Sequence, residues 1–176
     1  MEYVYRVPQN VGALARALKA EGIREHSVPF KIHVVEPYDS QLVLTSCRSY
    51  KFLFPVAHMM QETAAALSDQ ERSNQHVAGS LVVRFIAMSC TAMGDLGEQW
   101  PLVKVKIHAV VSTNGHTVLN QDVTSDFKAG GIYNNFNLTG YPDKEHAPQQ
   151  YAIATYRAII DSLEKVVSVS HERNIE

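Results

Sequence analysis

Residues 102–127 read LVKVKIHAVVSTNGHTVLNQDVTSDF, and this stretch decides the fold. Apolar and polar residues alternate on both sides of Asn114-Gly115. An Asn-Gly pair between two alternating runs is the strongest short-range signal for a β-hairpin, because both turn positions need a positive φ. Every odd-numbered residue from 103 to 111 is apolar, whereas the even-numbered ones are mostly polar. The pattern predicts two antiparallel strands with one buried and one wet face.

The register of this hairpin follows from burial. A two-residue loop that pairs Thr113 with His116 also sets Ile107 opposite Asp122. Slipping one strand by one residue moves every side chain to the other face, so burial selects the slipped register. That register predicts three apolar pairs, Val111 with Leu119, Ile107 with Val123 and Val103 with Phe127. We therefore expect a three-residue connection in which Gly115 or His116 is left-handed or bulged.

Length and composition bound the class of protein. The 176 residues fit a single α+β domain over 1–176, with an N-terminal arm and short helix over 1–26 and a frayed tail over 170–176. Lys and Arg number 16 against 18 acidic residues, without a basic run, so nucleic acid is not an expected partner. The start, MEYVYRVPQN, lacks the basic and apolar regions of a signal peptide. The expected location is the periplasm or outer membrane if an export signal was removed, and the cytoplasm otherwise.

The two cysteines, Cys47 and Cys90, have no zinc-type spacing. Two small buried side chains are the first interpretation. A disulfide is the alternative if the protein is exported, since oxidising compartments preserve disulfides.

The other elements follow from periodicity and from turn residues. We expect a short helix from Asn10 to Glu21 and a strand over 27–36 with Phe30, Ile32 and Val34 inward. A short strand over 41–45, a helix from 50–53 to about 69, a strand over 77–91 and a helix over 148–169 come next. The sum is an antiparallel sheet of about four to five strands, with two main helices packed on one face.

Two stretches are candidate contact surfaces. The strand over 77–91 is apolar on both faces, which is typical of a central strand or of one covered by a helix on one side and a partner on the other. The segment over 128–148 is rich in Gly and Asn yet carries three aromatic residues, so it is either an irregular cover of the sheet edge or a binding loop. The candidate interaction residues are Tyr133, Phe136, Tyr141 and Trp100.

Motifs for catalysis or for cofactor binding are not found in the sequence. His33 and His108 lie on wet strand faces and become neighbours if their strands pair, but a metal site needs further ligands. His58 and Glu62 lie one turn apart and are either an exposed polar pair or, beside a cleft, an acid/base pair. We expect no catalytic residue, no cofactor and no metal.

The run Arg48–Phe54, RSYKFLF, is expected to open a helix after a strand. Together with the long strand, the hairpin and the C-terminal helix, it resembles the small YajG-like lipoproteins of Gram-negative outer membranes. The resemblance implies a non-catalytic periplasmic α+β domain that binds other proteins, including a second copy of itself in an oligomer. It implies a membrane contact only through a lipid anchor, and this chain has no N-terminal cysteine to carry one.

A hotdog-like acyl-thioester-binding protein or thioesterase is the alternative. In that fold a long helix, here residues 50–69, is wrapped by the antiparallel sheet, and His58 or Glu62 is the polar group at the pocket. A domain with an apolar cavity for a small molecule is a third option. A helix 50–69 that lies beside helix 148–169 on one sheet face favours the envelope protein.

Overall fold

The computed structural model describes residues 4–7, 11–20, 30–35, 43–47, 50–68, 79–93, 100–128 and 147–173. Its helices are α1 (Val11–Ala20), α2 (Val56–Ser68) and α3 (Ala147–Arg173). Its strands are β1 (Val4–Arg6), β2 (Phe30–Val35), β3 (Val43–Cys47), β4 (Tyr50–Phe54), β5 (Gly79–Met93), β6 (Trp100–Thr113) and β7 (His116–Lys128).

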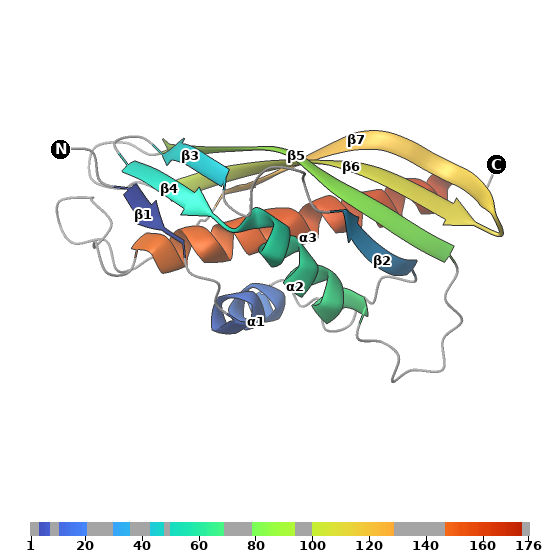
Figure 1. Ribbon diagram of the computed structural model, residues 1–176, viewed down its shortest axis with the longest axis horizontal. Coiled ribbons are helices and arrows are strands. Elements are labelled where there is room, and N and C mark those ends of the chain that lie inside the picture. The colour runs from blue at the N-terminus through green and yellow to red at the C-terminus, as the bar shows by residue number, and fades with distance from the viewer. Residues whose placement is uncertain are drawn as a thin grey trace.

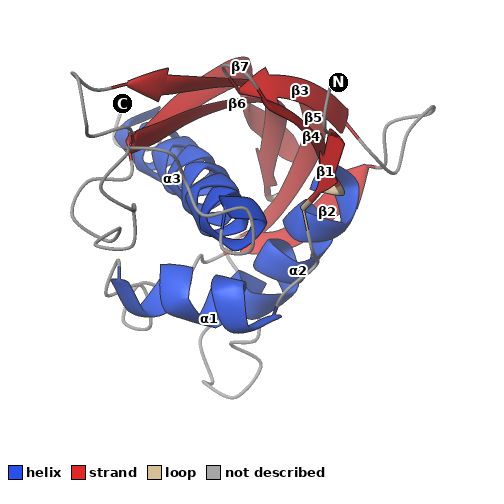
Figure 2. Cartoon of the chain, turned by 90° about the vertical axis from the view of Figure 1, so that its left-hand side faces the viewer, coloured by secondary structure: helices blue, strands red, loops and turns tan. Residues whose placement is uncertain are grey.

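The strands form a four-stranded sheet of order β2-β5-β6-β7 and a three-stranded sheet of order β1-β4-β3 (Figure 1). The pairs β5–β6 and β6–β7 are antiparallel, whereas β2 runs parallel to β5. Helix α3 packs against β6 and β7, α2 packs against β2, and α1 packs against α3. All three helices lie on one side of the strands (Figure 2). The predicted α+β class, with a mainly antiparallel sheet and helices on one face, is confirmed.

The apolar register and the left-handed Gly115 predicted for the β6–β7 hairpin are confirmed, but the predicted three-residue length of the connection is wrong. Val111 pairs with Leu119, Ile107 with Val123 and Val103 with Phe127. The turn itself has two residues, because Thr113 pairs with His116 and both Asn114 (φ 51°) and Gly115 (φ 79°) are left-handed. A register shift after Val111 absorbs the one-residue slip, since Ser112 pairs with Thr117 and leaves Val118 as the extra residue of a bulge.

The predicted helix start at 50–53 is wrong, because Tyr50–Phe54 is strand β4. Helix α2 begins at Val56, directly after Pro55, and its first bond runs from the Met59 N–H to the Pro55 carbonyl oxygen at 2.9 Å. A residue that precedes proline is pushed out of the helical region, which forces Phe54 to be extended. The run over 48–54 therefore leads into the helix as a strand and does not open it.

Helix α3 is the centre of the core. Its predicted apolar stripe is confirmed, since Tyr156, Ile159, Ile160, Leu163 and Val166 are all at most 1% exposed. The helix continues to Arg173, four residues beyond the predicted end near Val169. Its buried hydroxyl groups are satisfied within the helix: Thr155 donates to the Tyr151 carbonyl oxygen, and Ser162 donates to that of Ile159, each at 2.7 Å. A helix with such internal bonds can be buried on several sides.

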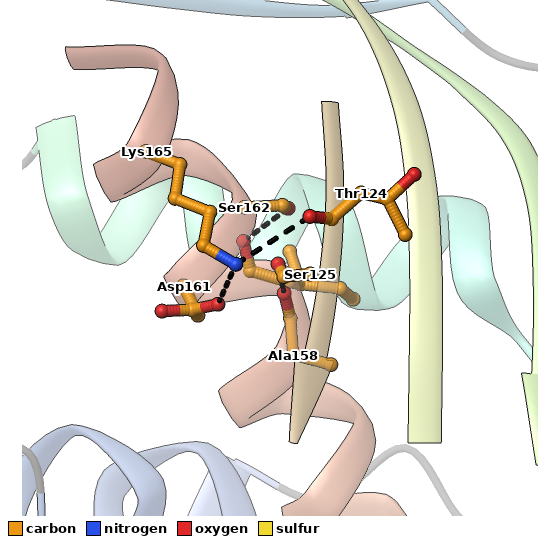
Figure 3. A network of polar contacts seen from close by, with 7 residues as sticks. Thr124, Ser125, Ala158, Asp161, Ser162 and Lys165 are labelled. Atoms are coloured by element: carbon orange, nitrogen blue, oxygen red, sulfur yellow. Dashed lines mark hydrogen bonds and ion pairs between the residues drawn. The ribbon is translucent and has the colours of Figure 1, made fainter. Parts of the chain in front are cut away.

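Polar contacts also fasten α3 to the edge strand β7 (Figure 3). The Ser125 hydroxyl is fully buried and donates to the Ala158 carbonyl oxygen at 3.1 Å. The Lys165 ammonium lies 3.2 Å from the Asp161 carboxylate on its own helix and 3.4 Å from the Thr124 carbonyl oxygen. About two turns before Lys165, the Arg157 guanidinium lies 3.8 Å above the Phe127 ring, a cation–π contact. These contacts fix the helix along β7.

The position of α2 separates the two fold hypotheses. Helix α2 contacts α3 and β2, and it keeps an exposed side at His58, Ala65 and Ala66. The helix beneath the curved strands is α3 (Figure 2). The hotdog arrangement requires the sheet to wrap α2, and the structure does not show it. The arrangement with α2 beside α3 is the one that favours the envelope protein.

Replacement of Gly79 by Ala tests how closely the β5–β6 pair is packed. A Cβ atom at Gly79 would overlap the Ser112 carbonyl oxygen and come within 2.9 Å of Thr113 Cγ2. We expect Gly79→Ala to lower the free energy of unfolding by about 1–3 kcal/mol, because neighbouring backbone cannot yield easily. Urea denaturation measures the loss.

The control is Gly115→Asn. Gly115 has a positive φ but open space around its Cα, and Asn tolerates the left-handed region. We expect this variant to lose less than about 1 kcal/mol. An equal or larger loss at Gly115 would contradict the close approach at Gly79.

Candidate interaction surface

The outer face of the four-stranded sheet, opposite the helices, is the candidate functional surface. Alternation along the strands turns the buried residues toward α3 and leaves the others outside. The strand pairing places four outer residues in one row, Val35, Arg84, His108 and Asp122. Val35 and Arg84 are exposed at the β2–β5 end, whereas His108 and Asp122 contact each other at the β7 end. The face thus has an apolar and cationic end and an ion-paired end.

A β-bulge enlarges the apolar end. The β5–β6 register shifts between Phe85 and Ala87, so Ile86 is the extra residue of β5. Ile86 and Ala87 are both exposed, although they are consecutive, while Phe85 and Met88 pack against the core. Bulges re-aim side chains and are common beside functional sites. Among the described residues the exposed large hydrophobic side chains are Val4, Val35 and Ile86, at 53%, 43% and 42%. Two of these three lie next to Arg84 on β2 and β5.

The ion-paired end is centred on Asp122. Its carboxylate oxygens lie 2.8 Å from Lys106 Nζ and 2.9 Å from His108 Nδ1. The hydrogen bond from Lys106, and after it the one from His108, holds the pKa of Asp122 below its ordinary value. All three side chains are between 37% and 45% exposed, so these contacts organise the surface and contribute little to stability.

The predicted meeting of His33 and His108 does not occur. Their strands do not pair, because β5 lies between β2 and β6 and sets Val82 opposite His33. Over the described part of the chain, no group of three or more His, Cys, Asp and Glu side chains is arranged to hold a metal ion. No helix in the same part is long and apolar enough to cross a membrane.

His58 and Glu62 form an ion-pair contact, and Glu62 has a second partner. The His58 Nε2 atom lies 3.2 Å from Glu62 Oε1, and the Tyr156 hydroxyl donates a hydrogen bond to Glu62 Oε2. Tyr156 is fully buried on α3, and Glu62 is 18% exposed. Glu62 therefore joins α2 to α3. The Glu62 carboxylate thus has a structural role. The pair predicted from the sequence, His58 and Glu62, has the buried Tyr156 as a third member.

The predicted interaction residues Tyr133, Phe136 and Tyr141 lie outside the described residues. Trp100 is the first residue of β6 and pairs with Met93, and only its backbone position is described. Among the residues that the structure describes, the surface centres instead on Val35, Arg84 and Ile86. The sequence signal that leads there is the strand over 77–91 with two apolar faces. That strand, β5, is central as predicted, between β2 and β6.

Cys90 forms a disulfide and is 5% exposed on the inner side of β5. The sequence holds one other cysteine, Cys47, in the neighbouring strand β3. The interpretation as two reduced, buried cysteines is therefore wrong. The alternative predicted for an exported protein is the one found.

Removal of the Lys106 ammonium tests the origin of the Asp122 shift. The contribution of a carboxyl group with a lowered pKa is present above its unfolded pKa and is lost as the pH falls through the lower, folded pKa. We expect Lys106→Met to raise the pKa of Asp122 toward its ordinary value, because the largest cause of the shift is removed. An NMR titration of the Asp122 side chain measures this. Lys31→Met, on the same sheet but away from Asp122, is the control and should leave that titration unchanged.

Loss of the Tyr156 hydroxyl tests the link between α2 and α3. We expect Tyr156→Phe to lower the free energy of unfolding by about 1–2 kcal/mol, because Glu62 loses a hydrogen bond at a partly buried site. Glu62→Gln keeps an oxygen acceptor for the tyrosine and should cost less. If Glu62→Gln costs more than Tyr156→Phe in urea denaturation, the carboxylate acts through its charge and not through this bond.

No protein-family model and no curated protein sequence matches the chain. Several solved structures are similar in outline. A Xanthomonas campestris protein of family DUF330 has a TM-score of 0.47 at 12% identity, over 82% of this chain and 84% of that one. A Caulobacter crescentus protein provisionally described as a lipoprotein scores 0.38 at 11% identity, over 89% and 98%. A minor lipoprotein of Acinetobacter baumannii scores 0.37 at 9% identity, over 81% and 90%. Identities and scores this low do not establish a family or a shared activity.

Proposed function

We propose that this protein is a non-catalytic component of the cell envelope that acts by binding another protein. Within that class, its order of elements resembles that of the YajG-like lipoproteins. The observation that carries the proposal is the disulfide of Cys90. Disulfides form and persist in oxidising compartments such as the periplasm, and they are rare in the cytoplasm. The bond therefore supports export.

The binding role is supported by the outer sheet face. Val35 at the end of the edge strand β2 and Ile86 in the central strand β5 are exposed aliphatic side chains on the outer sheet face, where a solvated face normally carries polar residues. Protein interfaces combine such apolar side chains with polar ones, and here Lys31, His33 and Arg84 are exposed polar residues on the same face. The carboxylate that could serve catalysis, Glu62, is held by two side chains between α2 and α3.

Location and redox state in the native organism test the proposal together. We expect the protein in the envelope fraction, with its cysteines protected from an alkylating reagent that is added before lysis. Recovery from the cytoplasm with two alkylated thiols would refute the proposal. Cross-linking before fractionation should join the protein to a larger envelope species.

The disulfide should also be needed for stability. The loop between Cys47 and Cys90 is of the size for which closure stabilises a fold by about 3–5 kcal/mol in the chain-entropy model. We expect reduction by dithiothreitol to shift the urea midpoint downward by a corresponding amount. The Cys47→Ala, Cys90→Ala double variant is the control, and its midpoint should not respond to the reductant. A native protein that is equally stable when reduced would contradict a structural role.

A further inference from the structure

We propose that Val35, Arg84 and Ile86, which we call the Arg84 patch, dock a partner protein that presents a carboxylate flanked by apolar side chains. This inference rests on the proposed function and deepens it by naming the chemistry of the partner. It begins with the two exposed aliphatic side chains. Val35 pairs with Arg84 across the β2–β5 ladder, and Ile86 follows Arg84 on β5. The Arg84 side chain therefore leaves the backbone between two exposed aliphatic residues, Val35 and Ile86.

The charge of Arg84 is not compensated within the described residues. Its neighbours in the strand ladders are Val35 on one side and His108 on the other, and neither is acidic. The carboxylate in the same row, Asp122, is two strands away and already holds Lys106 and His108. The other acid on this face of β7, Asp126, lies opposite Lys104. An arginine in this setting is suited to a planar, bidentate bond with an incoming carboxylate.

Lys31 adds to the positive charge near Arg84, and the side chains beside Arg84 on this face remain exposed. Lys31 and His33 lie on the same outer face of β2 as Val35. An acidic partner is therefore attracted along β2 toward Arg84, and its apolar side chains would be buried against Val35 and Ile86. Hot spots of protein interfaces combine arginine with desolvated apolar neighbours in this way.

The bulge in β5 gives the patch its shape. A regular strand after Phe85 would return Ala87 to the core and keep only Ile86 outside. The extra residue turns both Ile86 and Ala87 outward and restores Met88 and Cys90 to the inner side. Within the patch, Ile86 lies beyond the last β2–β5 pair, because β2 pairs with β5 only as far as Arg84.

The same charges argue against two other occupants. A second copy docked about a two-fold axis would bring one Arg84 patch against another, and like charges would meet without a free carboxylate. An anionic membrane binds clusters of about four or more unpaired basic side chains, whereas Arg84 and Lys31 are two, and Lys106 and Lys104 lie against Asp122 and opposite Asp126. The observations therefore favour a partner protein with negative charge.

Two short peptides of equal length and the same alternating pattern test the preference for an acidic partner directly. One alternates Val with Glu, and the other alternates Val with Lys. We expect only the acidic peptide to shift the NMR amide signals of Val35, Arg84 and Ile86. Arg84→Glu should weaken acidic-peptide binding by about 30-fold or more, since a docked charge pair is lost. The same variant should gain binding to the basic peptide.

Lys104→Glu is the matched control, because it makes the same change of charge on the outer face of β6. It should alter acidic-peptide affinity by less than about fivefold. All these variants change exposed side chains, so their melting temperatures should stay close to that of the parent. Equal binding of the two peptides, or no effect of Arg84→Glu, would overturn the proposal. Self-association, or binding of anionic vesicles, that Arg84→Glu abolishes would overturn it in favour of a second copy or a membrane.

A photo-cross-linking residue in native cells separates this inference from the proposed function. We expect a cross-linked envelope protein when the residue replaces Ile86, and none when it replaces Asn120, which is exposed on β7. The Ile86 product should disappear in the Arg84→Glu background. Cross-links from other positions but not from Ile86 would refute the Arg84 patch and leave the envelope-binding role intact. A reduced, cytoplasmic protein without cross-links would refute both.

Discussion

The packing of α3 against the inner face of the β6–β7 hairpin is the contact on which the other elements depend. Each fully buried large apolar side chain contributes about 1.5–3 kcal/mol, and α3 and the hairpin together supply six of the twelve largest fully buried side chains. Helix α1 and helix α2 both pack on α3, and the Phe52 ring of β4 lies 4.3 Å from the Tyr151 ring at the start of α3. Helix α3 therefore packs against both sheets. A helix in that position must be apolar on more than one side, as residues 151–160 are.

The hairpin shows how far local sequence determines structure. Burial alone gave the correct pairing of Val111 with Leu119, because a wrong register would expose a whole apolar face. The length of the connection was predicted incorrectly, because the extra residue of the second strand was assigned to the turn. The Asn114-Gly115 turn instead keeps its preferred two-residue form, and the bulge at Val118 takes the extra residue. Two strong local preferences were thus both satisfied, at the cost of one irregular ladder position.

The three-stranded sheet was missed for a physical reason. Tyr50–Phe54 alternates in the manner of a strand, with Phe52 and Phe54 fully buried, but the same side chains also fit a helical spacing with Val56 and Met59. A short apolar run cannot be assigned by periodicity alone. The neighbour that decides it is Pro55, which excludes a helical Phe54 and begins a new element. Of the two partners of β4, β3 overlaps the short strand predicted over 41–45, whereas β1 has three residues, too few to be predicted firmly.

The candidate surface could be predicted only in part, because its character depends on strand order. The sequence identifies β5 as a strand with two apolar faces, and it identifies Arg84 as the charged residue within it. It does not show that β2 joins β5 in parallel, which places Val35 beside Arg84 and separates His33 from His108. Had β7 been the neighbour of β5, the acidic residues of β7 would have lain beside the guanidinium. The order β2-β5-β6-β7 instead places Asp122 against Lys106 and His108, and Asp126 opposite Lys104. Among the described residues Arg84 therefore has no acidic neighbour in the strand ladders, and this follows from the non-local order of the strands.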